Sequence, residues 1–183
     1  MVYMLLGNGF EEIEAVAPLD LLRRADIGVS TVSLTSDLQV RGGHGVTVQA
    51  DITLDEVDFA SLEMLVLPGG GGGVDSIART PGAMDLVRRT MEAGKPLGAI
   101  CAAPSLLAAL DLMDGRRVTC HPAVYSKVEA GGGILQIELP VARDDNLITG
   151  KAAGASLDFG LELVAALRGR EASEEMRRTI MYS

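Results

Sequence analysis

The sequence contains few aromatic residues and no apolar stretch long enough to cross a bilayer. Phe, Trp and Tyr together make up 3% of the 183 residues, and Trp is absent. We therefore expect an aliphatic core and no aromatic platform on which nucleic-acid bases could stack. No apolar run approaches the roughly 20 residues that a transmembrane helix needs, so no membrane association is predicted.

Positive charge and cysteine are also scarce. The chain has 16 Lys and Arg against 25 Asp and Glu, a formal net charge of −9. Such a chain does not attract a phosphate backbone, so nucleic acid is not expected as a partner. Only two Cys are present, too few for a disulfide framework, and residues 1–6 lack the basic segment of a signal peptide. We predict a cytoplasmic protein with free thiols.

Short apolar runs alternate with longer amphipathic segments, which is typical of a parallel sheet covered by helices. The predicted strands are 2–6, 29–34, 64–67, 97–100, 117–120, 134–137 and 146–149, with a hairpin at 40–49. The predicted helices are 12–25, 81–93, 103–110, 155–167 and 173–180. The glycine run 69–73 is expected to be either a flexible turn or a backbone that closely approaches a substrate. We predict an α/β fold with one domain over residues 1–183.

Residues 98–104 place Cys101 directly after a buried strand and just before a helix. Small neighbouring residues permit a sharp turn, as in a nucleophile elbow. A thiol at the start of a helix is expected to favour the thiolate, and backbone N–H groups of the turn could receive an oxyanion. The alternative is that Cys101 is a small buried apolar residue.

Three loops, 7–14, 68–73 and 101–104, follow predicted parallel strands, where ligands of open α/β sheets bind. Glu14 lies beside the apolar positions of the first helix and could face this edge. Next to a thiol, burial and like charge would raise its pKa, and the protonated carboxyl could donate a hydrogen bond to the thiolate. The other acidic residues of this turn, Glu11 and Glu12, are explained by the helix dipole.

The chain contains two histidines. His121 follows a predicted strand and could activate the thiol, although an exposed loop position explains it equally well. His44 lies at the tip of the glycine-rich hairpin and is expected at the surface or an interface, whereas Cys120 is expected to be packed inside. Because no Cys and His residues have the spacing of metal ligands, we predict no metal site.

Four blocks of sequence together resemble the DJ-1/PfpI (ThiJ/PfpI) superfamily, and its DJ-1 branch most closely. These blocks are Glu11–Glu14, Pro68–Gly70, Ala99–Pro104 and Thr119–Pro122. Their order and spacing match the family, and the resemblance extends from residue 2 to about 167. It implies a flavodoxin-like sandwich, with helices on both faces of the sheet, and a homodimer.

The resemblance also implies roles for individual residues. Cys101 matches the nucleophile, Glu14 the carboxyl that contacts it and His121 a nearby histidine. Oxyanion or substrate-binding positions are matched by Gly69, Gly70 and Ala102. Ala103 departs from the Gly of many relatives, and His44 from an Arg.

The implied activity is that of a glutathione-independent glyoxalase. Such an enzyme converts methylglyoxal or glyoxal to the hydroxy acid without a cofactor, and repair of glycated proteins is a related activity. Two alternatives remain open. One is a cysteine-based sensor of oxidative stress or a chaperone, and the less favoured one is a PfpI-type cysteine peptidase.

Overall fold

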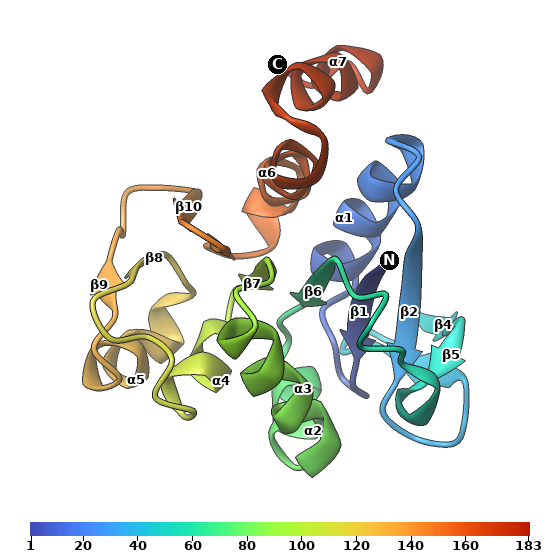
Figure 1. The fold of residues 1–183 in the computed structure, drawn as a ribbon, viewed down its shortest axis with the longest axis vertical. Coiled ribbons are helices and arrows are strands. Elements are labelled where there is room, and N and C mark those ends of the chain that lie inside the picture. Colours follow the sequence, from blue (N-terminus) through green and yellow to red (C-terminus); the bar gives the residue numbers. More distant parts are fainter.

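A seven-stranded sheet forms the centre of the molecule (Figure 1). The computed structural model describes residues 1–183, and the strand order is β10-β11-β7-β6-β1-β2-β5. Neighbouring strands are parallel, except that β10 and β11 are antiparallel. The strands of this sheet are β1 (Val2–Leu6), β2 (Val29–Ser33), β5 (Ile52–Thr53), β6 (Met64–Leu67), β7 (Leu97–Ile100), β10 (Val141–Asp144) and β11 (Leu147–Gly150). The predicted fold class is confirmed.

The central strands are the continuous apolar runs of the sequence. Every residue of β1, β6, β7 and β11 is buried. Strands covered by helices on both faces have this composition, because neither face meets water. In the register, Met4 lies beside Val66 and Ile100 beside Gly150. The carboxyl ends of these four strands therefore meet at one edge of the sheet.

Helices cover both faces of the sheet and form two separate cores (Figure 1). On one face, α1 (Glu12–Arg24), α6 (Ser156–Arg168) and α7 (Arg170–Thr179) enclose a cluster that includes Met4 and Phe159. On the other face, α2 (Gly71–Ala78), α3 (Pro81–Glu92) and α4 (Pro104–Ala108) enclose a cluster that includes Leu65 and Leu107. Both cores are mainly aliphatic, as the composition predicts.

Two small sheets lie outside the central one. The predicted hairpin is confirmed as β3 (Gln39–Arg41) and β4 (Thr47–Gln49), which pair antiparallel. The strands predicted at 117–120 and 134–137 are shorter, β8 (Arg117–Val118) and β9 (Ile134–Leu135), and pair with each other instead of joining the central sheet. Elements that the sequence analysis missed are α2, β5, β10, α5 (Tyr125–Ala130) and the short 3-10 helices η1 (Leu54–Glu56), η2 (Pro122–Val124) and η3 (Ala153–Ala155).

The glycine run after β6 is not a flexible turn throughout, because Gly71–Gly73 form the first turn of α2. This turn packs closely against the loop between β1 and α1. A Cβ on Gly73 would lie 2.7 Å from the Cα of Phe10, so only glycine permits the approach. The absence of side chains thus allows a helix to begin where local propensity disfavours one.

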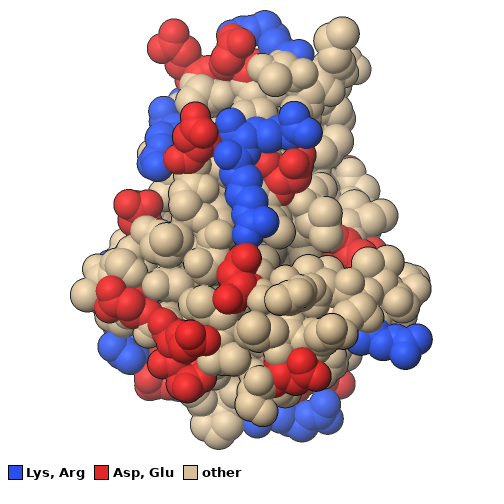
Figure 2. Space-filling view, turned by 90° about the vertical axis from the view of Figure 1, so that its right-hand side faces the viewer, with Lys and Arg blue, Asp and Glu red and all other residues tan.

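Some of the charged side chains form ion pairs on the surface. Figure 2 shows one face, on which acidic and basic side chains are mixed. Examples are the ion pairs of Arg23 with Asp51 and of Arg24 with Asp20. None of the helices combines the length and hydropathy required to cross a membrane. The single domain, the cytoplasmic location and the absence of a nucleic-acid partner stay predictions.

Candidate active site

Cys101 occupies a strained turn between β7 and α4. Its φ is +65°, in the left-handed region that residues with a Cβ seldom adopt. Hydrogen bonds on both sides hold the turn, since Cys101 N donates to Gly150 O at 2.9 Å and His121 N donates to Cys101 O at 2.8 Å. The thiol is half-buried. This is the geometry of a nucleophile elbow, in which strain displays the side chain at the sheet edge.

Glu14 reaches the same edge from α1. The residue is 1% exposed, and its carboxylate accepts a hydrogen bond from Gly69 N at 3.0 Å. Burial raises the pKa of this carboxyl from 4.5 to about 7, and the negative charge of Glu11 adds to the rise. Hydrogen bonds from the Cys101 thiol and from the backbone of Gly69 and Ala153 lower the pKa and offset part of this rise. Glu14 can therefore hold a proton near neutral pH.

The glycines after β6 let the backbone approach the thiol. A Cβ on Gly69 would lie 2.6 Å from Cys101 Cβ and would also overlap the Glu14 carboxyl, so the two side chains are neighbours across this glycine. Gly70 has a φ of +86°, which suits glycine. The N–H groups of Gly70 and Ala102 are directed at the Cys101 sulfur, whereas Gly69 N–H is occupied by Glu14.

The protonation states of Cys101 and Glu14 depend on each other. Burial, together with the negative charge and hydrogen bond of Glu14, raises the pKa of the Cys101 thiol to about 12. The backbone N–H groups of Gly70 and Ala102 lower this pKa but do not cancel the rise. The expectation that the helix start alone favours the thiolate is therefore wrong here, because the thiol is buried beside a carboxylate and α4 has only 5 residues. Two negative charges do not coexist at this site near neutral pH, so the thiolate forms when Glu14 holds the proton.

His121 meets Cys101 through its backbone. Its N–H donates to Cys101 O, and its ring Nδ1 accepts a hydrogen bond from Ala123 N at 3.2 Å at the start of η2. The latter bond assigns the ring proton to Nε2. Cys120 is fully buried in the core, as expected. The backbone of Ala153, at the start of η3, also lowers the pKa of Glu14, and no sequence pattern singled it out.

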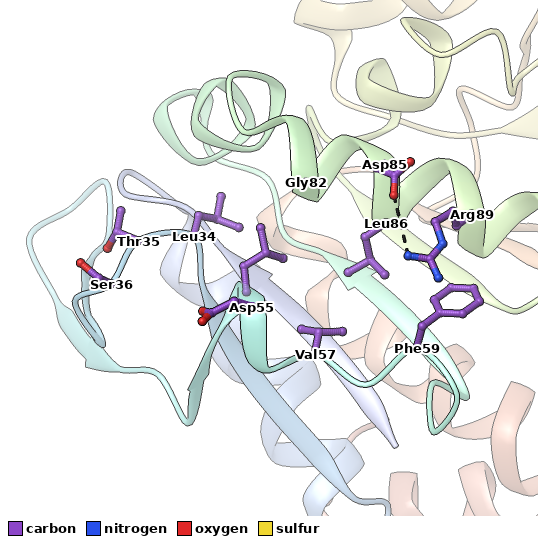
Figure 3. Close-up of a pocket in the computed structure, with 11 residues that line it drawn as sticks. Leu34, Thr35, Ser36, Asp55, Val57, Phe59, Gly82, Asp85, Leu86 and Arg89 are labelled. Carbon is purple, nitrogen blue, oxygen red and sulfur yellow. Dashed lines mark ion pairs between the residues drawn. The ribbon is translucent and has the colours of Figure 1, made fainter.

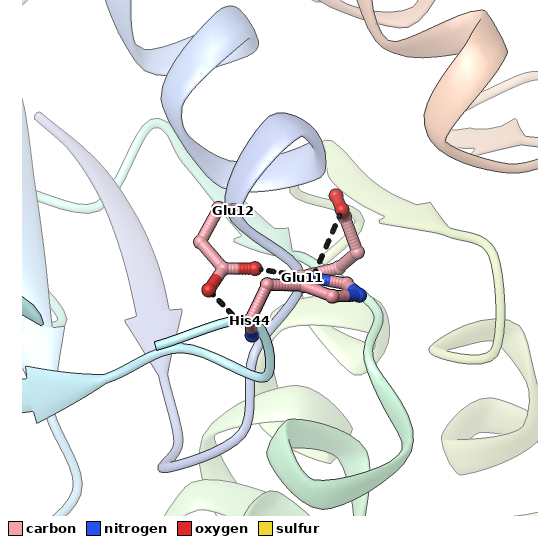
Figure 4. A group of neighbouring side chains, drawn as sticks. All are labelled: Glu11, Glu12 and His44. Atoms are coloured by element: carbon pink, nitrogen blue, oxygen red, sulfur yellow. Dashed lines mark hydrogen bonds and ion pairs between the residues drawn. The ribbon is translucent and has the colours of Figure 1, made fainter. Parts of the chain in front are cut away.

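A second group of ionisable residues lies at the start of α1 (Figure 4). Glu11, Glu12 and His44 form the one cluster whose ligand-type atoms could share an ion, all lying within 4.8 Å of one another. His44 Nδ1 is 2.8 Å from Glu12 Oε2, so these two groups already satisfy each other. The pair connects the hairpin tip to the helix, 32 residues apart in sequence, and for that reason sequence analysis missed it.

A cavity of about 530 Å³ lies away from the thiol, between η1 and α3. Figure 3 shows Phe59 and Arg89 at one end, where the guanidinium lies 4.2 Å from the ring centroid. None of the lining residues belongs to the set around Cys101. The cavity therefore contributes nothing to the candidate active site.

Known proteins are similar to this chain in sequence and in fold. The sequence profile described as "DJ-1/PfpI family" matches residues 1–166. "Protein DJ-1 homolog B" of Arabidopsis thaliana is 36% identical over 96% of this chain, which spans 40% of the plant protein's length. "Glutathione-independent glyoxalase DJR-1.2" of Caenorhabditis elegans is 29% identical over 93% of this chain and 89% of the worm protein. The crystal structure of a mutant of a DJ-1 superfamily protein from Salmonella typhimurium has a TM-score of 0.93 and 37% identity, covering 100% of this chain and 98% of that one.

Proposed function

This chain belongs to the DJ-1/PfpI family, and on that premise we propose that it is a cysteine-dependent enzyme acting on small reactive aldehydes. The proposed reaction converts methylglyoxal or glyoxal to the corresponding hydroxy acid without glutathione or a cofactor. The name of the worm relative, a glutathione-independent glyoxalase, supports this choice of reaction. Cys101 is proposed as the nucleophile and Glu14 as the group that exchanges its proton.

The arrangement of Cys101 and Glu14 carries the proposal. A half-buried thiol on a left-handed turn lies beside a carboxyl whose pKa is raised to about 7, and two backbone N–H groups are directed at the sulfur. A carboxyl that titrates near neutral pH can both take and return a proton. Backbone donors close to a nucleophile are placed to stabilise an oxyanion formed on the carbon that it attacks.

The proposed reaction begins when the thiol proton passes to Glu14 and the sulfur attacks the aldehyde carbon of methylglyoxal. An S–C bond forms, and the N–H groups of Gly70 and Ala102 stabilise the resulting oxyanion. Glu14 returns the thiol proton to the substrate oxygen, and Glu14 or His121 then moves the proton of that carbon to the neighbouring ketone carbon through an enediol. The first carbon is oxidised and the second reduced, which leaves a lactate thioester. One water cleaves the thioester, releases lactate and restores the thiol.

A redox sensor or chaperone is the alternative from a different class. A single reactive thiol serves either role, and oxidation of Cys101 would need no carboxyl to move protons between substrate carbons. The proton-sharing pair favours the enzyme, because catalysis uses the buried carboxyl and sensing does not require it. The peptidase is less favoured, since the similar proteins of known name are DJ-1 homologues.

Lactate formation from methylglyoxal, without glutathione or added metal, tests the proposed function. We expect turnover in the wild type, background turnover in Cys101→Ser and a loss of about 100-fold or more in Glu14→Gln. Cys120→Ala is the matched control, because it removes the other thiol and leaves the site intact. An inactive wild type whose Cys101 still reacts with peroxide would favour the sensor, and full activity in Cys101→Ser would refute the mechanism.

We also propose a homodimer that uses an exposed apolar face of α1 and the hairpin. Ile13, Val16 and Val46 are 56%, 46% and 54% exposed. They line a groove of about 780 Å³ together with Leu157 and Ile180. Exposed apolar patches of this kind are typical of protein interfaces. The face begins one residue from Glu14, so a second copy would lie next to the site.

A further inference from the structure

The tip of the β3–β4 hairpin is fastened to the start of α1 by His44 and Glu12 (Figure 4). His44 N donates to Glu12 Oε1 at 2.7 Å, and the His44 ring Nδ1 lies 2.8 Å from Glu12 Oε2. Glu12 is 9% exposed, whereas the side chain of His44 is 75% exposed. A Cβ on Gly42 would overlap the Glu12 carboxyl, so the hairpin backbone lies directly against it. The buried Glu12 carboxylate therefore binds the exposed imidazole of His44.

The same hairpin also binds the loop that precedes α1. Gly9 N donates to Arg41 O at 2.7 Å, and Gly43 N donates to Phe10 O at 2.8 Å. In the opposite direction, Arg41 N donates to Asn8 Oδ1 at 3.0 Å. Hairpin and loop are therefore joined by hydrogen bonds at several points.

This loop forms one wall of the candidate active site. Glu11 N donates to Gly69 O at 3.0 Å, and the Glu11 carboxylate accepts from Glu14 N at 2.8 Å. A Cβ on Gly70 would lie 2.5 Å from Glu11 N, so the loop touches the glycine whose N–H faces Cys101. The hairpin therefore contacts the loop, and the loop contacts the glycines beside the thiol.

The hairpin tip is also electrostatically close to the site. His44 Nδ1 lies 3.8 Å from Glu11 Oε1, and Glu11 in turn raises the pKa of Glu14 by its negative charge. The hydrogen bond and charge of Glu12 raise the pKa of His44 above its usual 6.5. The charged groups that face His44 are Glu11 and Glu12, and Arg41 lies on the same hairpin. A protonated His44 offsets part of the negative charge beside Glu14.

We propose that His44 is a positioning residue, which through Glu12 holds the β1–α1 loop against Gly69 and Gly70 and lowers the energy of the anionic Cys101–Glu14 pair. The proposal rests on the proposed function only in taking Cys101 as the reactive group. It assigns a role to a side chain that does not touch the thiol.

The pH profile of Cys101 alkylation by iodoacetamide, located by mass spectrometry, tests this role. At pH 6, where the imidazole carries its proton, His44→Ala should react about threefold more slowly than the wild type, and this difference should disappear as the pH rises and the wild-type imidazole loses its charge. His44→Lys retains a cation beside Glu12 and should keep the wild-type rate at pH 6. Arg178→Ala, which removes the surface ion pair with Glu175 on α7, is the control and should also keep it.

Two results would overturn the proposal. One is a wild-type profile in His44→Ala. The other is an equal loss of rate in the Ala and Lys variants at every pH, because a purely structural clamp would reduce reactivity without changing its dependence on pH. Alkylation needs no aldehyde, so either result stands whether or not methylglyoxal is converted. Thermal unfolding of each variant confirms that the compared proteins are folded.

Discussion

Burial of the Glu14 carboxyl destabilises the folded state. Its neighbours on α1, Glu11 and Glu12, meet backbone N–H groups and His44, whereas Glu14 is 1% exposed beside a thiol. Burial and the charge of Glu11 raise its pKa to about 7. A group held this way stores free energy that is released when the protein unfolds, as is common at functional sites.

The first prediction concerns the stability of the Glu14→Gln variant. The folded-state pKa of Glu14 lies above the unfolded one, so the folded state retains a proton that the unfolded chain loses between pH 4.5 and about 7. The free energy of unfolding should therefore fall by about 3 kcal/mol across this window in the wild type relative to the variant. Urea unfolding at pH 4.5 and pH 8, with reduced thiols, measures the difference. A constant difference between the two proteins would contradict the prediction.

The second prediction concerns Gly69. In Gly69→Ala, the new Cβ would lie 2.6 Å from Cys101 Cβ and 3.0 Å from Ile100 O, so the turn must shift. We expect loss of methylglyoxal turnover, slow alkylation of Cys101 and a destabilisation of about 1–3 kcal/mol. Gly154→Ala is the matched control, since a Cβ there meets nothing within 4 Å. Equal activity and stability in the two variants would show that the close approach is unimportant.

At the scale of elements, α2 depends on contact rather than on propensity. Its first three residues are glycines, which disfavour a helix, yet the helix begins at Gly71. It forms because Gly73 packs on Phe10 and because Val74 and Ile77 are buried in the core under α3. The helix start therefore packs directly on the loop between β1 and α1.

The third prediction compares two glycines of α2. In Gly73→Ala, the Cβ would lie 2.7 Å from Phe10 Cα, and overpacking should destabilise the protein by about 1–3 kcal/mol. In Gly71→Ala, the Cβ meets nothing within 4 Å, so the higher helix propensity of Ala should stabilise by up to about 1 kcal/mol. Urea unfolding of both variants provides the comparison. The same sign of effect in both would show that contact with Phe10 does not decide this helix.

At the scale of the whole molecule, the apolar face of α1 links assembly to the site. The face includes Ile13 and Val16, and Glu14, which stands between them in the sequence, is buried toward Cys101. A partner packed on this face would exclude water from the start of α1. Assembly and the environment of the site are then expected to vary together.

The fourth prediction concerns the oligomer. The wild type should have a mass of twice 19.2 kDa in light scattering, and Val16→Asp should have 19.2 kDa, because a buried unpaired charge opposes association. Ile134→Asp is the control, since Ile134 is 51% exposed but lies on β9, outside this face. A monomeric wild type, or a dimeric Val16→Asp, would rule out this interface.

The sequence by itself determined the buried strands β1, β6 and β7 and the sharp turn at Cys101. It also singled out Glu14 rather than Glu11 or Glu12. These features depend on neighbours within a few residues, where apolar runs, small side chains and helical spacing act directly. The family resemblance rests on the same local blocks, and the profile match confirms it.

Only the tertiary structure decided the pairing of Glu12 with His44, the formation of α2 in a glycine run and the separation of β8 and β9 from the central sheet. It also reversed the expected effect on the Cys101 thiol, whose pKa is raised to about 12. The physical reason is the same in each case. Burial, close approach and charge depend on which distant segments the sheet order brings together, and no local pattern contains that information.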